Sequence, residues 1–282
     1  PAEKEAFEAR GYHVLRQALT PQEVATYRNA VLRILRLPAD HPYFGSLAPT
    51  GLAPARRPPE NPHAIWAGFD LPLFDDCFYD LAFHPRIALA VDALIGPDIN
   101  LYETSFISKL PHFPGTFRDW HQDSEYSDPQ SNDRNVTVIL CLDAMDGQSG
   151  ATWVAPCSHK LGPLPHVTPS ESVSSKAREV AHKERFEAQG HSFSFQAGDA
   201  LIFLVRLVHK SGPNATNRSR LSLAYNYVRK DTLDLRNKHR YIGAGTPIVR
   251  NGRIHTPFQT LPFATEGNAE RVAEDPDQKE VR

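Results

Sequence analysis

The first hundred residues carry apolar patterns typical of helices. A short helix is predicted for residues 2–10, and a longer one begins after Thr20, which forms a capping-box pattern with Glu23. Between residues 24 and 34 apolar side chains recur every three or four positions, so one face of this helix is expected to pack on a core. A further helix is predicted for residues 85–94.

From residue 99 the pattern changes to short runs of β-branched and aromatic residues separated by turn residues. These runs occupy residues 99–110, 134–144, 151–158, 191–196, 199–209 and 220–228. Many short strands without helical patterns between them favour a sandwich or barrel over a parallel α/β sheet. The chain is therefore expected to be mainly β, with flanking helices.

The other segments are rich in proline or in polar residues. Prolines cluster in residues 38–64, a stretch too long for an ordinary connection and typical of a functional loop. Residues 170–190 are polar and predicted to be an excursion between strands. We expect one domain over residues 1–265, with helical elements to about residue 97, a β core over about 98–230, an extension over 231–265, and a mobile tail over 266–282.

Composition excludes several classes of function. The 31 Lys and Arg residues nearly balance the 33 Asp and Glu residues and are scattered, which argues against nucleic acid and anionic membranes as partners. No segment approaches the ~20 apolar residues that span a bilayer, and the first residues lack the apolar core of a signal peptide. The three cysteines are odd in number and widely spaced. We expect a cytoplasmic protein.

A candidate metal site lies at His121 and Asp123. Residues two apart on an extended backbone point to the same face, so both side chains can share one ion. His209 follows a strongly apolar strand and is expected to approach from a neighbouring strand. Two His and one carboxylate bind one face of iron(II) and leave the other positions open for a co-substrate and oxygen.

The H-x-D spacing alone is a weak signal, because such pairs are often surface hydrogen-bonding residues. Arg220 strengthens it: it follows His209 by eleven positions, and Ser222 lies two residues further on the same strand face. Arg220 can pair with a carboxylate through two hydrogen bonds, and Ser222 can donate a third. A dicarboxylate such as 2-oxoglutarate needs this kind of anchor at its far end.

The order and spacing of these motifs resemble the phytanoyl-CoA dioxygenase family, which includes ectoine hydroxylases. The likeness runs from about residue 5 to about residue 230. The segments that carry it are residues 7–24, 84–102, 120–126 (WHQDSEY), 147–160 and 198–227.

The resemblance implies a double-stranded β-helix, a jelly-roll or cupin-like core, and an oxidoreductase that uses Fe(II), 2-oxoglutarate and O2. It implies that His121, Asp123 and His209 bind the metal and that Arg220 binds the co-substrate. Such enzymes oxidise an unactivated C–H bond, most often to an alcohol, and release succinate and CO2. A carboxylate at position 123 favours oxygenation over halogenation, because related halogenases have a small residue there.

The family also implies co-substrate contacts from Ser105 and Thr137, while Ile139 stands where many relatives have Trp. Lys109 lies on the same strand face as Ser105 and is either a solvated charge at the strand end or a functional group. Five residues are candidates for the substrate mouth, each equally interpretable as packing or surface: Trp66, Arg118, Glu125, Tyr126 and Arg206.

The substrate itself is not readable from the sequence. The lack of a basic patch argues against a coenzyme A thioester and favours a small free metabolite or natural-product intermediate. The same centre could instead perform desaturation, cyclisation, epoxidation or peroxide formation, since these outcomes share every ligand. A non-catalytic metal-binding β-barrel is the alternative from another class, and the Arg220 and Ser222 pair argues against it. The oligomeric state stays open.

Overall fold

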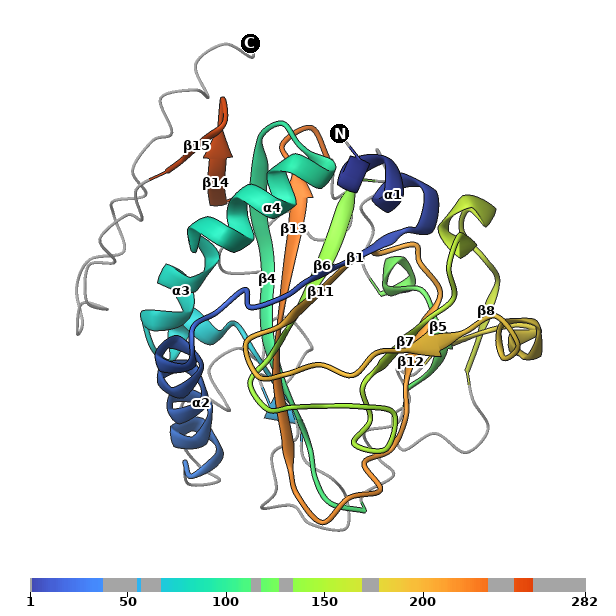
Figure 1. Cartoon of the computed structure of the whole chain (residues 1–282), viewed down its shortest axis with the longest axis horizontal. Helices are drawn as coiled ribbons and strands as arrows, with labels where there is room; N and C mark the ends of the chain where they lie inside the picture. Colours follow the sequence, from blue (N-terminus) through green and yellow to red (C-terminus); the bar gives the residue numbers. More distant parts are fainter. Residues whose placement is uncertain are drawn as a thin grey trace.

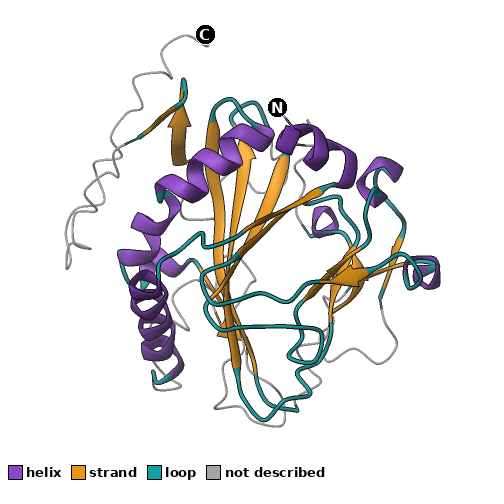
Figure 2. Cartoon of the chain, in the orientation of Figure 1, coloured by secondary structure: helices purple, strands orange, loops and turns teal. Residues whose placement is uncertain are grey.

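The fold is seen in a computed structural model, which describes residues 2–37, 55–56, 67–112, 118–126, 134–168, 178–232 and 246–255. Two antiparallel sheets face each other, and helices cover the outer face of the larger one (Figures 1 and 2). The helices are α1 (Ala2–Arg10), α2 (Pro21–Leu35), α3 (Cys77–Ala82) and α4 (Pro85–Ile95). Short 3-10 helices are η3 (Leu71–Leu73), η5 (Asp123–Glu125), η6 (Ser158–Leu161) and η7 (Lys183–Phe186).

The larger sheet has nine strands within the described residues, in the order β1-β11-β6-β13-β4-β14-β15, with β3 paired to β4 and β2 to β3. Its strands are β1 (Tyr12–Leu15), β2 (Ala55–Arg56), β3 (Ala67–Phe69), β4 (Ile99–Lys109), β6 (Asn135–Cys141), β11 (Ala200–Leu204), β13 (Arg220–Arg229), β14 (Thr246–Arg250) and β15 (Arg253–Ile254).

The smaller sheet has the order β10-β7-β12-β5, and β8 pairs with β9 beside it. These strands are β5 (Arg118–His121), β7 (Thr152–Val154), β8 (His166–Val167), β9 (Glu179–Val180), β10 (His191–Ser192) and β12 (His209–Ser211).

The two faces of the larger sheet carry different side chains. On the outer face Val138, Leu223 and Tyr225 pack with helix residues such as Ile34 and Val91 in the main core. The Tyr225 hydroxyl donates to the carbonyl of Phe78 in α3, 2.7 Å away. This packing fixes which residues of β4, β6 and β13 point the other way.

We call that other side the inner face; it points toward the smaller sheet. A second apolar cluster lies there, including Ile139 of β6, Leu201 of β11 and Ala224 of β13, together with Val154 of β7. Polar residues on the same strand faces are therefore directed into the space between the sheets.

The predicted helices and the mainly β fold are confirmed. α2 begins with the expected capping box: the Glu23 amide donates to the Thr20 hydroxyl, and the Thr20 amide donates to the Glu23 carboxylate, 2.7 Å away. The expected helix over residues 85–94 is α4. The strand runs are confirmed at β4, β6, β7, β10 and β13.

One strand prediction is wrong. Residues 199–209 form two strands, since β11 ends at Leu204 and a turn closed by the Leu207 amide on the Leu204 carbonyl leads into β12 of the other sheet. His209 thus opens β12 rather than ending the apolar strand. Three predicted features lie outside the described residues: most of the proline-rich stretch, Trp66 and the tail over 266–282.

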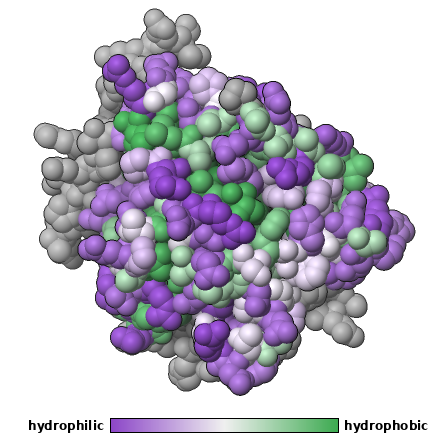
Figure 3. Space-filling model, viewed as in Figure 1, coloured by the Kyte–Doolittle hydropathy of each residue, from purple (hydrophilic) through white to green (hydrophobic). Residues whose placement is uncertain are grey.

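No helix among the described residues is long and apolar enough to cross a membrane. On the face shown in Figure 3, hydrophilic side chains predominate, with smaller apolar areas between them.

Candidate metal centre

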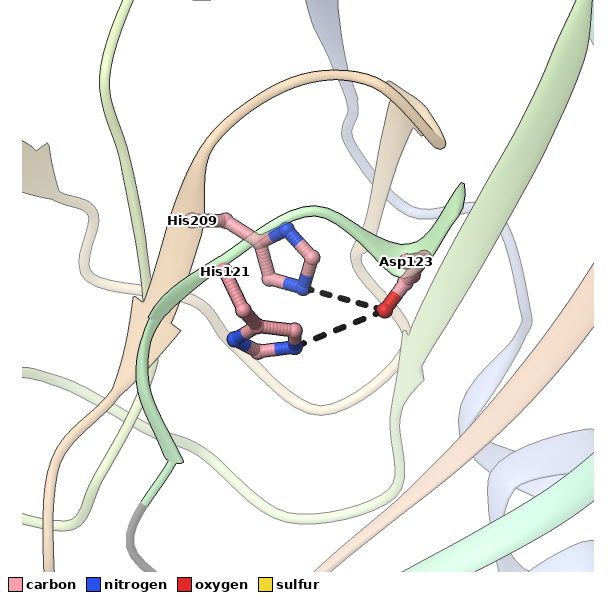
Figure 4. Close-up of side chains that lie close together, drawn as sticks. All are labelled: His121, Asp123 and His209. Atoms are coloured by element: carbon pink, nitrogen blue, oxygen red, sulfur yellow. Dashed lines mark ion pairs between the residues drawn. The ribbon is translucent and has the colours of Figure 1, made fainter. Parts of the chain in front are cut away.

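Three potential metal ligands converge at the edge of the smaller sheet. His121 ends β5, His209 opens β12, and the two residues are direct register partners. Asp123 begins η5, one extended residue after His121. Its Oδ1 lies 3.5 Å from Nε2 of each imidazole, and both rings point at it (Figure 4). One ligand atom from each residue lies within 4.8 Å of the others, which is compatible with a shared ion.

Backbone carbonyls orient both imidazoles. Nδ1–H of His121 donates to the Asp119 carbonyl at 2.6 Å, and Nδ1–H of His209 donates to the Leu207 carbonyl at 3.0 Å. Because Nδ1 carries the hydrogen, Nε2 of each ring has a free lone pair, which points into the site. A second hydrogen bond of this kind is the usual support for a histidine that binds a metal.

A residue of the inner face orients the Asp123 carboxylate. The Thr137 hydroxyl of β6 donates to its Oδ2 at 2.8 Å, so Oδ1 is left to face the imidazoles. Burial opposes ionisation of this carboxyl, but the neighbouring His209 and His121 rings outweigh it and hold its pKa well below the usual range. The same carboxylate raises the pKa of His209 against the effect of burial. The trio is therefore built around a permanent negative charge.

Gln122, between the two ligands, fixes the loop that carries them. Its fully buried side chain donates to the carbonyls of Gly162 and Arg206 and accepts from the Leu164 amide. Its own amide donates to Nε2 of His166 at 3.1 Å. Gln122 is not among the residues predicted from the sequence, because a lone glutamine belongs to no recognisable motif.

The excursion over residues 178–192 supports β5 and β12 from outside. Trp120, fully buried, donates from Nε1 to Glu187 at 2.8 Å, and Lys210 forms an ion pair with the same carboxylate. The Lys210 ammonium also lies 4.6 Å from the centroid of the Trp120 ring. The predicted excursion is thus a packed support for the strands that carry the ligands.

Arg220 lies on the inner face with an incomplete set of partners. Its side chain donates to the Ser222 hydroxyl at 2.9 Å and to the Gly150 carbonyl, while Nε is buried and has no partner among the described residues. Burial lowers the pKa of the guanidinium to about 10, which still leaves it charged at neutral pH. A buried guanidinium without a carboxylate partner favours an anionic ligand.

Lys109 lies directly opposite Arg220, on β4. It is 1% exposed, which excludes the solvated interpretation, and its ammonium donates to the Gly212 carbonyl at 2.7 Å. Burial, followed by the nearby charges of Arg220 and Arg118, lowers the pKa of Lys109 well below its usual value. The Arg220 guanidinium makes this end of the inner face electropositive, and its charge is one reason that the pKa of Lys109 is lowered. The sequence could identify Lys109 only through its alternation with Ser105.

Two further predicted residues lie on the same face. Ser105 is 6% exposed and stands opposite Ala224, while Ile139 stands on the other side of Ala224. Both line the space between Arg220 and the metal trio. Thr137 also lies on this face, and its hydroxyl contacts Asp123; the predicted contact of Thr137 with the co-substrate stays a prediction.

The described candidates for the substrate mouth take different positions. The Tyr126 ring is 5.8 Å from that of His121, and its hydroxyl accepts from the Arg178 amide. Glu125 lies 3.7 Å from His166, behind the ligand loop. Arg118 stands opposite Ser211, towards Lys109. The Arg206 carbonyl accepts from Gln122, as described above. Tyr126 is thus the candidate in contact with a ligand ring.

The donor set fits non-haem iron(II), because two imidazole nitrogens and one carboxylate oxygen are the ligands that bind one face of this ion. Two facing antiparallel sheets, with this trio on the smaller sheet and the buried Arg220 on the inner face of the larger one, are typical of Fe(II)/2-oxoglutarate-dependent dioxygenases.

Comparison with known proteins identifies the family. The chain belongs to the phytanoyl-CoA dioxygenase family, whose sequence profile matches residues 7–222. It is 26% identical over 243 residues to an ectoine dioxygenase from Nocardia farcinica, covering 81% of this chain and 78% of that protein. It is 27% identical over 224 residues to a probable alpha-ketoglutarate-dependent hypophosphite dioxygenase from Stutzerimonas stutzeri, covering 76% and 73%.

Among solved structures, EctD from S. alaskensis, determined with 2-oxoglutarate and 5-hydroxyectoine, superimposes with a TM-score of 0.65 at 20% identity. The match covers 83% of this chain and 77% of that one. The expected double-stranded β-helix is confirmed, and the enzyme class is that of the family: oxidation of small-molecule C–H bonds with Fe(II), 2-oxoglutarate and O2.

Proposed function

We propose that this enzyme hydroxylates an unactivated C–H bond of a small free metabolite or natural-product intermediate, with His121, Asp123 and His209 holding the iron. The observation that carries the proposal is the pairing of this trio with a buried, incompletely partnered Arg220 on the same inner face. A structural metal site would need the first group but not the second.

Arg220, Ser222 and Lys109 are proposed to bind the far carboxylate of 2-oxoglutarate. The Arg220 Nε–H is available, and the Ser222 hydroxyl is 2.9 Å from the same guanidinium. A carboxylate between Arg220 and Lys109 would neutralise the buried guanidinium and favour the protonated form of Lys109, which stands opposite it in the sheet. Charge-assisted hydrogen bonds of this kind are about twice as strong as neutral ones.

When bound, the iron and 2-oxoglutarate supply the oxidising chemistry, and the protein supplies position and shelter from water. The carbonyls of Asp119 and Leu207 hold both imidazoles in one tautomer, and Thr137 fixes the carboxylate. A carboxylate ligand at Asp123 also occupies the position that chloride would need, which favours hydroxylation over halogenation.

A small free substrate agrees with the names of two relatives, an ectoine dioxygenase and a hypophosphite dioxygenase. It also agrees with the balanced charge of the chain, since the phosphates of coenzyme A would favour clustered Lys and Arg.

The test is succinate formation by the purified protein with Fe(II), ascorbate and 2-oxoglutarate under air, with a panel of small metabolites. We expect slow turnover without substrate, faster turnover with the right metabolite, and a loss of at least about a hundredfold in His209→Ala, since the open metal site loses a ligand. The matched control is His182→Ala, because the His182 side chain is 86% exposed. Absence of turnover together with absence of Fe(II)-dependent 2-oxoglutarate binding contradicts the proposal.

A further inference from the structure

His166 is a buried histidine beside the metal centre that is not one of the three candidate ligands. It opens β8, and only 1% of its side chain is exposed. Its Nδ1 lies 2.8 Å from the Leu164 carbonyl and 3.7 Å from a carboxylate oxygen of Glu125. Both of these groups are acceptors, so the ring hydrogen is on Nδ1 and Nε2 has a free lone pair.

This lone pair accepts the backbone amide that lies between two ligands. The Gln122 N–H donates to His166 Nε2 at 3.1 Å. His166 is oriented in the same way as His121 and His209, since in all three rings Nδ1–H donates to the carbonyl two residues earlier. In the two ligands Nε2 points at Asp123, whereas in His166 it points at the peptide after His121.

The Gln122 side chain extends this contact toward the third ligand. Its Nε2 donates to the Arg206 carbonyl at 2.6 Å, in the turn between β11 and β12. The Ser124 amide donates to the same turn at 3.1 Å. The next residue of the turn after Arg206 is Leu207, whose carbonyl orients His209. The segment that carries the other two ligands is thereby fixed against the turn that leads to His209.

His166 itself is held by elements outside this segment. It pairs with Val180 across β8 and β9, and the Ala181 amide donates to the Pro165 carbonyl at 2.9 Å. Gln122 is fully buried, so without the imidazole its amide would lose its acceptor away from water. An unpaired buried amide is costly, and the backbone between the ligands would shift to find another partner.

We propose that His166 is a positioning residue of the metal centre. By accepting the Gln122 amide it fixes the peptide between the first two ligands, and the Gln122 side chain transmits that position to the turn before His209. This inference rests on the proposed function and adds to the metal site a residue that does not touch the ion. Loss of the acceptor should therefore change the geometry of the ligands, not only the stability of the fold.

The test compares two variants. His166→Phe keeps a ring but removes the acceptor, whereas His166→Gln places Oε1 where Nε2 lies and can still accept the amide. Each is titrated with Co(II) in place of Fe(II), because the visible absorption of Co(II) reports the geometry of its ligands. Hydrogen bonds that orient ligands commonly contribute about tenfold to a hundredfold to metal affinity, so we expect His166→Phe to lose at least about tenfold and to show a changed spectrum. His166→Gln should restore most of the affinity and the wild-type spectrum.

The matched control is His191→Phe, the same substitution in the same sheet. His191 lies on β10, at the edge opposite β5, and its Nε2 lies 3.3 Å from the Tyr12 hydroxyl. This contact does not include the segment that carries the ligands. Co(II) affinity and spectrum should therefore stay those of wild type.

A measurement on the wild-type protein does not depend on the folding of any variant. In protein loaded with diamagnetic Zn(II), the nitrogen chemical shifts of the His166 ring should show a hydrogen on Nδ1 and an unprotonated, hydrogen-bonded Nε2. A hydrogen on Nε2 would exclude the contact with the Gln122 amide and overturn the inference.

Two further results overturn the inference while the proposed function stands: an unchanged Co(II) affinity and spectrum in His166→Phe, or an equal loss in His166→Gln. If His166→Phe does not fold, His166→Gln and the wild-type ring decide. If the wild-type protein binds no Co(II), the assignment of the ligands falls too. The wild-type titration therefore separates the two proposals.

Discussion

At the scale of single residues, the metal trio depends on hydrogen bonds from groups that do not bind the metal. The carbonyls of Asp119 and Leu207 fix the tautomers of the two imidazoles. The Thr137 hydroxyl donates to Asp123 Oδ2, so that Oδ1 faces the site. The H-x-D spacing predicted from sequence that His121 and Asp123 lie together in a candidate metal site, and the structure places them together. The support from Thr137 was not predictable, because it depends on the approach of β6 to the loop after β5.

Thr137→Val tests this support, since valine keeps the shape and removes the hydroxyl. We expect Fe(II) affinity to fall about tenfold to a hundredfold, because Asp123 Oδ2 loses its donor. The measurement is competition for Fe(II) against a chelator of known affinity. Thr26→Val is the control, since the Thr26 hydroxyl is an exposed donor to a carbonyl of α2. Unchanged iron affinity with weaker 2-oxoglutarate binding would instead make Thr137 a co-substrate contact.

Asp199, just before β11, accepts hydrogen bonds from residues that follow β1. These contacts lead us to expect that stability depends on pH. Burial would raise the pKa of its carboxyl, but amides of Gln17 and Gln196 and the Arg16 guanidinium outweigh this and lower it. A carboxyl with a lowered pKa stabilises the fold fully above its unfolded pKa and loses that contribution as pH falls through its folded pKa.

Asp199→Asn should therefore be less stable than wild type by about 1–3 kcal/mol at pH 7, with the gap narrowing below about pH 4. Urea unfolding across this range measures it. A gap that stays constant into acid would show that shape, not charge, accounts for the loss.

At the scale of elements, the pattern of apolar residues predicted helices well and the turn after β11 badly. α2 was predictable from its capping box and from apolar residues that recur every three or four positions. The turn into β12 gave no signal, because Val205, Leu207 and Val208 are apolar and buried whether the chain turns or continues. A continuous apolar run shows burial, and only the sheet partners decide where it bends.

The excursion that supports β5 gives a packing prediction. A methyl group on Gly190 would overlap the buried ring of Trp120 and approach the Phe186 carbonyl to 2.9 Å. Gly190→Ala should therefore destabilise the protein by about 1–3 kcal/mol, measured by urea unfolding. The control is Gly147→Ala, where the nearest atom would be an ordinary 3.5 Å away. Equal effects of the two changes would contradict the packing of Trp120 described above.

At the scale of the whole molecule, the metal trio joins two strands of one sheet and is supported by the other sheet. The general architecture followed from many short strands and the family resemblance. The pairing of Lys109 with Arg220 did not, because it exists only in the register between β4 and β13, which are more than a hundred residues apart in sequence.

Metal binding should stabilise the whole fold, since the ligands come from separate strands. With free Fe(II) at about 100 times its dissociation constant, the gain is about 2.7 kcal/mol, which appears as a rise in melting temperature under anaerobic conditions. Chelation should reverse the rise, and His209→Ala should abolish it. A melting temperature that does not change with Fe(II) would contradict the assignment of His121, Asp123 and His209 as metal ligands.

The position of β5 has a kinetic consequence. Among the described residues it is a four-residue strand at the edge of the smaller sheet, paired with β12, and it ends at one candidate ligand and leads directly to another. A strand paired on one side has fewer backbone hydrogen bonds to break than a central strand, and segments with few such contacts open first in local unfolding. In the metal-free protein, amide hydrogens of residues 118–123 should therefore exchange with solvent before those of β6 or β13. The metal site would then open locally at β5 while the larger sheet stays folded.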